Sequence, residues 1–533
     1  MPIKIILLVA FFAVTVFVGF YFRKRAASVS GFVLAGRNVG PWLTAFAYGT
    51  SYFSAVVFVG YAGQFGWRFG TAAVWIGLGN AFIGALLPWI ILGRRTRIMT
   101  HHLGSATMPE FFGKRFNSTS LKIGASVIIF IFLIPYTASL YNGLSRIFSI
   151  AFEIDFLYVI IGMAILTAIY VVAGGYFATA VNDLIQGIIM IVGMIAVLIV
   201  ALGEHGGLLS ALAKMGEVPP DPGMPITSPG ALSSFFGPDP ISLLGVVLLT
   251  SLGTWGLPQM VSKFYSIKSE KTINKGAIIS TVFALIIAGG SYFLGSFGRL
   301  YGGVIERTAE GAPIFDSIIP KIVSSFPDIL VGIVIVLVLS ASVSTLSSLV
   351  MASSSTLTLD VLKGHVFKKM GEKKQLLFIR LLVVVFIAIS VLIALIQYNA
   401  QGSIIFIAQL MGISWGALAG SFLAPFLFSL YWKRVNKTSV WFCFGFSTLI
   451  TVVHVILNVF FHNAFVEVVP PILQSPINAG AFLMLAGLVI VPVVTLLSKA
   501  PQKKLTDECF SCYEKTVSVK VQDDLGDGGD FSQ

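Results

Sequence analysis

The sequence predicts an all-α protein that crosses a membrane many times. Hydrophobic residues make up 56% of the 533 residues and charged residues only 11%, whereas a soluble domain carries about 25% charged residues. Apolar runs of about 20 residues, long enough to cross a hydrocarbon core of roughly 30 Å, recur as far as residue 498. Basic residues gather in alternate loops between these runs. We therefore expect a multi-pass protein of the plasma membrane, surrounded by the lipid bilayer.

Thirteen apolar runs are predicted to be membrane-spanning helices. They cover approximately residues 3–22, 41–62, 71–93, 123–147, 153–174, 178–202, 240–261, 276–297, 329–360, 376–398, 402–431, 438–461 and 478–498. In the first run the basic cluster at residues 23–25 follows the apolar segment, so we expect a retained helix and not a cleaved signal peptide. Residues 1–498 thus form the predicted transmembrane domain.

The positions of lysine and arginine predict the orientation, because these residues are enriched in short cytoplasmic loops. With the N-terminus outside, the inner loops receive the basic clusters at residues 23–25, 94–97, 263–271, 363–374 and 433–434. An odd number of spans then places the C-terminus inside. The net charge of +12 follows from this topology and requires no nucleic-acid partner.

The polar segment at residues 499–533 is predicted to be a disordered cytoplasmic tail, since it is rich in glycine and aspartate. Cys509 and Cys512 form a CxxC pair within it. Disulfides are uncommon in the cytoplasm, and two thiols without further ligands are weak support for a metal site.

Two spans contain small, polar and helix-breaking residues at mid-membrane depth. The second reads AYGTSYFS at residues 47–54, and the seventh reads TSLGTWGLP at residues 250–258. Non-helical backbone persists in a membrane only where it is buried or lines a wet cavity. The two spans lie five apart, as expected if residues 41–202 and 240–431 are inverted repeats whose first helices are broken. Alternatively, the small residues only allow close helix packing.

The ninth span carries hydroxyl groups on one helical face. Ala341, Ser344, Thr345 and Ser348 are spaced i, i+3, i+4 and i+7 and therefore share that face. A sodium ion prefers several oxygen ligands, which hydroxyls can supply together with carbonyls freed from a broken helix, such as those of Thr50 and Phe53. The alternative is that the hydroxyls bond to the carbonyls one turn earlier and contribute only to packing.

Asp183 lies near the start of the sixth span, where a carboxylate marks an ion or proton path by default. Its alternative role is to cap the N-terminus of that helix at the membrane interface. Asn80 and Gln409 are further polar residues within spans. The spans contain no HExxH, nucleophile elbow, Walker loop or carboxylate pair, so we expect neither an enzyme nor a cofactor.

Several short motifs along the chain complete this pattern. They are Leu34-Ala35-Gly36-Arg37, Met108-Pro109-Glu110-Phe111-Phe112, Pro258 with Lys263-Phe264 and Ile267-Lys268-Ser269, the hydroxyl run from Ser344 to Ser348, and Tyr431-Trp432-Lys433-Arg434. Over nearly its whole length the chain resembles the sodium/solute symporter family, which includes sodium/proline, sodium/pantothenate and sodium/sugar transporters. This resemblance implies a LeuT-type fold of five-plus-five inverted repeats with extra helices.

The resemblance also implies which residues bind ions and solute. A first sodium ion would be held by Thr50, Phe53, Ala341, Ser344 and Thr345, and a second, found in only some members, by Asp183, Ser344, Ser347 and Ser348. Thr250 and Thr254 replace the aromatic pair of the proline transporters. The implied solute pocket contains Val56, Val57, Asn80, Thr254, Trp255 and Gln409.

We therefore predict sodium-coupled symport of a small organic solute, such as an amino acid or a carboxylate, by alternating access. Sodium is the only metal ion that this hypothesis requires. Two alternatives are a proton-coupled transporter that uses Asp183 and a membrane solute sensor. A sensor would usually need an appended signalling domain, and the tail is too short for one.

Overall fold

The fold was derived from a computed structural model of the chain, which describes residues 2–152, 154–219, 229–307, 311, 313–367, 369–399 and 407–514. The predicted all-α class is confirmed. The first half contains α1 (Pro2–Tyr21), α2 (Val29–Leu34), α3 (Pro41–Tyr52), η3 (Val56–Tyr61), α4 (Ala62–Phe69), α5 (Val74–Ala81), η5 (Phe82–Leu86), η6 (Trp89–Gly93), α6 (Arg94–His102), α7 (Met108–Arg115), α8 (Thr119–Phe152), α9 (Phe156–Glu204) and α10 (Leu208–Gly216).

The second half begins with a helix pair that corresponds to the predicted seventh span. It contains α11 (Pro240–Gly256), α12 (Pro258–Tyr265), α13 (Lys271–Ala284), η8 (Leu285–Gly289), α14 (Gly290–Ser296), α15 (Ile318–Ser324), α16 (Asp328–Thr356), η11 (Leu357–Val366), α17 (Glu372–Asn399), α18 (Ile407–Tyr431), α19 (Lys437–Phe460), α20 (His462–Val468), α21 (Pro471–Gln474), α22 (Pro476–Leu497), α23 (Lys503–Phe510) and η12 (Ser511–Tyr513). The predicted eleventh span starts at residue 402, and its residues 402–406 lie outside the described part of the chain.

Ten described helices are long and apolar enough to span a membrane, or eleven if the bent pair α11–α12 is one span. Two of the ten are far longer than one crossing requires. One covers Val56–His102 and the other Phe156–Glu204, with 47 and 49 residues. A crossing needs about 20 residues. The first contains Gly70 and the second Gly175, and both glycines adopt a positive φ that bends the chain.

Both predicted helix breaks are present, and they have the same backbone geometry. α3 ends as Phe53 turns to φ −94° and ψ 126°, and α11 ends as Leu257 turns to φ −76° and ψ 123°. In each case the amide of the extended residue donates to the carbonyl of a glycine four residues earlier, Gly49 or Gly253. The two halves of the second break are bent by 43°.

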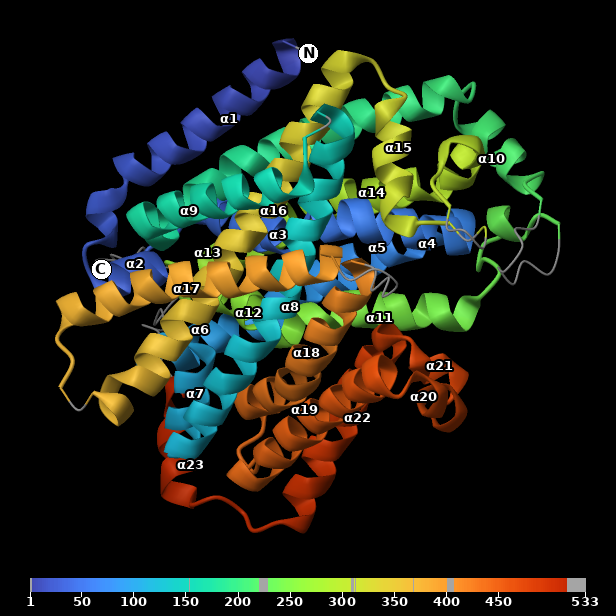
Figure 1. Cartoon of the computed structure of the whole chain (residues 1–533). Coiled ribbons are helices and arrows are strands. Elements are labelled where there is room, and N and C mark those ends of the chain that lie inside the picture. The colour runs from blue at the N-terminus through green and yellow to red at the C-terminus, as the bar shows by residue number, and fades with distance from the viewer. Residues whose placement is uncertain are drawn as a thin grey trace, which may run out of the picture.

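α16 forms the centre of the bundle. It packs against α1, α3, α8, α9 and α17, and 89% of its most apolar window is buried inside the protein. Figure 1 shows α16 next to α9 and α3 in the middle of the molecule, with α1 at the edge and α19 to α23 at the opposite end. The hydroxyl-rich helix is therefore surrounded by protein and is shielded from lipid.

The beginning of the C-terminal tail differs from the expectation of disorder. Lys503–Phe510 forms α23, and Tyr513 follows in η12. The Phe510 side chain is buried and lies under the guanidinium of Arg115 at 5.0 Å, and the Tyr513 hydroxyl donates to the carbonyl of Arg95. These aromatic contacts fold the segment against α6 and α7. Residues 515–533 lie outside the described part of the chain.

Two glycines allow α4 and α14 to approach each other closely. A Cβ atom at Gly66 would lie 2.0 Å from the backbone of Gly295, and a Cβ atom at Gly295 would lie 2.0 Å from the carbonyl oxygen of Ala62. No side chain can occupy that space, and backbone atoms cannot move aside as a flexible side chain can. The contact therefore depends on glycine at both positions.

Gly66→Ala should lower thermal stability, because overpacking of this kind costs about 1–3 kcal/mol. The midpoint of heat-induced aggregation of the detergent-purified protein, followed by size-exclusion chromatography, measures the effect. Gly162→Ala is the matched control, since a Cβ atom at Gly162 meets nothing within 4 Å. An equal midpoint for the Gly66 variant and the wild type would contradict the packing argument.

Candidate functional site

The break after α3 leaves backbone carbonyls available for binding. The helical hydrogen bonds stop at the bond from Phe53 N–H to Gly49 O, and they resume with the bond from Val57 N–H to Ser54 O. The carbonyls of Thr50 and Phe53 lie between these two points. Buried carbonyls require a partner, and in the membrane interior water does not provide one.

α16 provides that partner through two hydroxyl groups. The Ser344 hydroxyl lies 3.1 Å from the Thr50 oxygen, and the Thr345 hydroxyl lies 3.2 Å from the oxygens of both Thr50 and Phe53. The same hydroxyls lie 3.0 and 2.9 Å from the carbonyl oxygen of Ala341. All five residues predicted for the first sodium ion therefore meet at one point.

This cluster suits a small monovalent cation. It offers three carbonyl and two hydroxyl oxygens from Thr50, Phe53, Ala341, Ser344 and Thr345, and all five residues are at most 1% exposed. Hydroxyl oxygens have lone pairs that can turn toward a cation, and carbonyls of an unwound helix coordinate ions in other transporters. The cluster contains no carboxylate, so it matches a weakly charged ion such as Na⁺ better than a divalent one.

The residues predicted for a second sodium ion are less free to bind one. The hydroxyl of Ser347 donates to the carbonyl of Ser344 at 2.8 Å. Ser348 accepts a hydrogen bond from the ammonium of Lys263 at 2.9 Å. Asp183 is 1% exposed on α9, and within the described part of the chain its carboxylate oxygens accept no hydrogen bond. It lies inside the helix and not at its N-terminus, so it is not a helix cap.

Lys263 was expected in an inner loop, and that expectation is wrong. It belongs to α12, and its side chain is only 2% exposed. The only sequence signal for a buried lysine was its position just after a broken helix. Because other basic residues lie nearby in the chain, Lys263 resembled a loop residue.

Three of the six residues predicted to contact solute are hydrogen-bonded to other parts of the protein. Thr254 donates to the carbonyl of Gly84, and the Trp255 indole donates to the carbonyl of Ile83, so both side chains have partners in η5. Asn80 accepts from Ser251, while its amide nitrogen has no partner within the described residues. The remaining three are Val56 and Val57, buried in η3, and Gln409, half-buried at the start of α18. Their contact with a solute stays a prediction.

Three polar side chains that the sequence did not single out gather at the first break. Ser54 follows Phe53 directly, Tyr136 comes from α8 and Trp415 from α18. The Tyr136 hydroxyl faces both other groups, and the rings of Tyr136 and Trp415 lie 5.9 Å apart. All three polar atoms are buried, and none completes a hydrogen bond within the described part of the chain.

The Trp415 ring also connects this cluster with the second break. It lies 5.8 Å from the ring of Tyr52, and it fills the space beside Gly253, where a Cβ atom would lie 2.5 Å from the indole. Aromatic faces beside unpaired donors are typical of sites that accept a small polar solute with an apolar part. An aromatic or serine residue in a helix is usually part of the core, so the sequence gave no specific signal for these positions.

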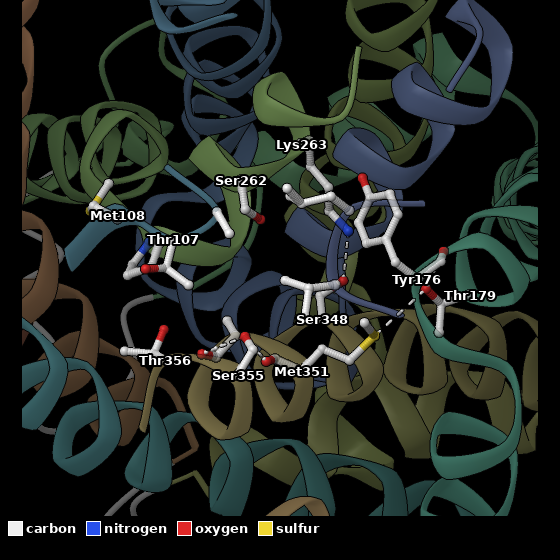
Figure 2. A pocket seen from close by; sticks show the side chains of 15 residues that line it. Thr107, Met108, Tyr176, Thr179, Ser262, Lys263, Ser348, Met351, Ser355 and Thr356 are labelled. Carbon is white, nitrogen blue, oxygen red and sulfur yellow. Dashed lines mark hydrogen bonds between the residues drawn. The ribbon is translucent and has the colours of Figure 1, made fainter. Parts of the chain in front are cut away.

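A small cavity of about 40 Å³ lies beside α16, close to the ion cluster. Figure 2 shows its lining, with Thr107 and Met108 on one side and Tyr176 and Lys263 on the other. The cavity follows α16 from Thr356 to Ser348. Ser344 and Thr345 lie one helical turn beyond Ser348.

Comparisons with known proteins identify relatives over most of the chain. The profile of the "Sodium:solute symporter family" matches residues 32–441. The osmoregulated proline transporter OpuE of Bacillus subtilis is 28% identical over 527 residues, which cover 98% of this chain and all of that protein. The sodium/proline symporter 2 of Staphylococcus saprophyticus is 29% identical over 442 residues, 81% of this chain and 82% of that protein.

A solved structure shares the fold. The substrate-bound outward-open Na⁺-coupled sialic acid symporter superposes with a TM-score of 0.69 over 94% of this chain and 99% of that chain, at 17% sequence identity. An identity this low establishes the common fold alone.

Replacing the two hydroxyls of the ion cluster, Ser344→Ala with Thr345→Ala, should raise the sodium concentration for half-maximal binding at least tenfold. Each of the two substitutions removes one ligand oxygen, and a hydrogen bond to a charged group contributes about 1.5–3 kcal/mol. Sodium-dependent thermal stabilisation of the purified protein measures this. Ser342→Ala is the control, because within the described residues Ser342 bonds only to the carbonyl of Val338. A double variant with the sodium dependence of the wild type would exclude these residues as ligands.

Proposed function

Because the chain belongs to the Sodium:solute symporter family, we propose that it imports a small amino acid of the proline type together with sodium. The protein is a multi-pass transporter of the plasma membrane and not an enzyme, as its family and relatives are transporters. These relatives, a proline transporter and a sodium/proline symporter, favour sodium coupling and a proline-type solute over a proton-coupled transporter or a sensor.

One observation carries the proposal. The Phe53 carbonyl belongs to the ion cluster, and the next residue, Ser54, belongs to the group of unpaired polar side chains with Tyr136 and Trp415. A sodium ion that fixes the extended segment at Phe53 also fixes the position of Ser54. Sodium binding therefore lowers the entropic penalty of solute binding, which is a coupling free energy between two sites.

The chemistry of the second group fits a small zwitterion. The indole N–H of Trp415 and the hydroxyl of Tyr136 can donate to a carboxylate. The faces of Tyr52 and Trp415 can cover an apolar ring and attract a positively charged amine. A proline-like solute combines all three features in one small molecule.

The topology of the proposal has thirteen crossings, with the N-terminus outside and the C-terminus inside. The structure has eleven spans if α11 and α12 count as one. Each of the two long helical ranges becomes two crossings when it is divided at Gly70 or Gly175, which brings the number to thirteen.

The matching geometry at Phe53 and Leu257 supports two inverted repeats, about residues 41–202 and 240–431. The small cavity is lined by Leu34 and Thr107, next to basic loops that this topology places inside, which favours an inward-facing conformation.

Transport by proteoliposomes tests the proposed function. An inward sodium gradient should drive accumulation of radiolabelled L-proline above its external concentration, and replacing sodium by choline should abolish it. A proton gradient without sodium should not support uptake. Uptake that persists in choline would contradict sodium coupling, and sodium-driven uptake of a different solute would contradict only the proline assignment.

Tyr136→Phe should raise the KM for L-proline by roughly 10- to 100-fold, since a hydrogen bond to a carboxylate contributes about 1.5–3 kcal/mol. Initial rates of uptake at saturating sodium measure this. Tyr141→Phe is the matched control. Tyr141 is also a fully buried tyrosine of α8 without a hydrogen-bond partner in the described structure, but its hydroxyl faces Thr167. Equal KM values for the Tyr136 variant and the wild type would remove Tyr136 from the solute site.

A further inference from the structure

A buried lysine occupies the place where a second cation would bind. The Lys263 side chain leaves α12 and reaches α16, where its ammonium donates to the Ser348 hydroxyl at 2.9 Å. Figure 2 shows this bond at the end of the cavity, with the Tyr176 ring beside the lysine. The ammonium nitrogen lies 5.0 Å from the centre of that ring, within the range of a cation–π contact.

The hydrogen bonds that start at Lys263 have a fixed direction. An ammonium can only donate, so the Ser348 hydroxyl must accept from it. The Ser348 oxygen lies 2.7 Å from the Ser51 oxygen, and the Ser51 hydroxyl donates to the carbonyl of Ala47 at 2.6 Å. Ser348 therefore donates to Ser51. The chain of bonds joins α12, α16 and α3, which include parts of both broken helices.

Asp183 supplies the opposite charge. Its carboxylate and the Lys263 ammonium attract each other through the protein interior, although within the described residues no hydrogen bond joins them. Both side chains are almost completely buried. An isolated carboxylate in a dry interior is strongly unfavourable, whereas a pair of opposite charges is tolerated. The cluster of Asp183, Lys263 and Ser348 is thus neutral before any ion enters.

We propose that the Lys263 ammonium is a tethered cation that replaces a second sodium ion, so that the transporter couples its solute to one sodium ion. This inference rests on the proposed sodium coupling through the first cluster. A sodium ion placed between Asp183 and Ser348 would meet the ammonium at close range, and like charges repel strongly in a low-dielectric interior. The Ser348 hydroxyl already accepts a bond from Lys263, so the ammonium occupies one of the two lone pairs with which this oxygen could bind another cation.

The position of the tethered charge gives it a role in the transport cycle. Ser348 lies one helical turn from Ser344, and Ser51 lies between Thr50 and Phe53, so the lysine supports the same segments that hold the first sodium ion. A covalently attached cation cannot leave with the solute. Asp183 therefore remains neutralised after sodium is released, and the empty transporter does not have to move an unpaired buried charge.

The number of bound sodium ions tests this inference. Detergent-purified protein is titrated with ²²Na⁺ in a scintillation proximity assay that counts saturable ions per chain. The wild type should bind one ion, and Lys263→Arg should also bind one because it keeps the charge. Lys263→Met leaves Asp183 without its partner and should bind two. The double variant Lys263→Met with Asp183→Asn should return to one.

Two results would contradict the tethered-cation proposal while leaving the proposed sodium coupling intact. They are two sodium ions bound by the wild type, or one sodium ion bound by Lys263→Met. A wild type without saturable sodium binding would overturn the proposed sodium coupling as well. If Lys263→Met does not fold, the wild type itself can show whether one or two sodium ions are coupled to the solute. The reversal potential in proteoliposomes then gives the charge moved per transported L-proline. A ratio of one elementary charge supports the inference, and a ratio of two overturns it.

Discussion

The fold depends on one constraint, which is that backbone carbonyls freed by a broken membrane helix must find partners without water. At Phe53 those partners are the hydroxyls of Ser344 and Thr345. This requirement places the hydroxyl-rich face of α16 against α3 and keeps α16 in the centre of the bundle. It also creates a site that a cation can enter, because the hydroxyls can turn their lone pairs from the carbonyls to an ion with little movement of the backbone.

The two broken helices share more than their position in the chain. Phe53 and Leu257 have nearly the same backbone angles, and each donates to a glycine four residues earlier. Trp415 bridges the two breaks, since its ring lies on Tyr52 and against Gly253. Under the proposed function, this aromatic contact would transmit a rearrangement at one break to the other, as a two-state coupling between ion and solute sites requires.

The buried charges of Asp183 and Lys263 differ in kind from the ion cluster. The first cluster is neutral and built only from oxygen atoms with flexible lone pairs, which leaves room for a mobile cation. The second contains a carboxylate and an ammonium that are fixed to the chain. A fixed pair stabilises one arrangement of α9, α12 and α16, whereas a mobile ion favours a conformation only while it is bound. The two clusters lie one helical turn apart on α16. Under the proposed function, the first binds a mobile ion and the second holds three helices together.

The sequence by itself determined the membrane class, both helix breaks and the five residues that meet at the first ion cluster. The class and the breaks depend on local signals, namely hydrophobic run length and the placement of glycine and proline. The five residues follow from the helical face shared by Ala341, Ser344 and Thr345, together with the resemblance to the symporter family. Only the tertiary structure decided that Ser54, Tyr136 and Trp415 meet, that Lys263 is buried against Ser348, and that Lys503–Phe510 is folded. Within a helix, a tyrosine or tryptophan has the same sequence signature whether it fills the core or lines a pocket. A lysine next to other basic residues resembles a loop residue until the packing of three distant helices removes it from water.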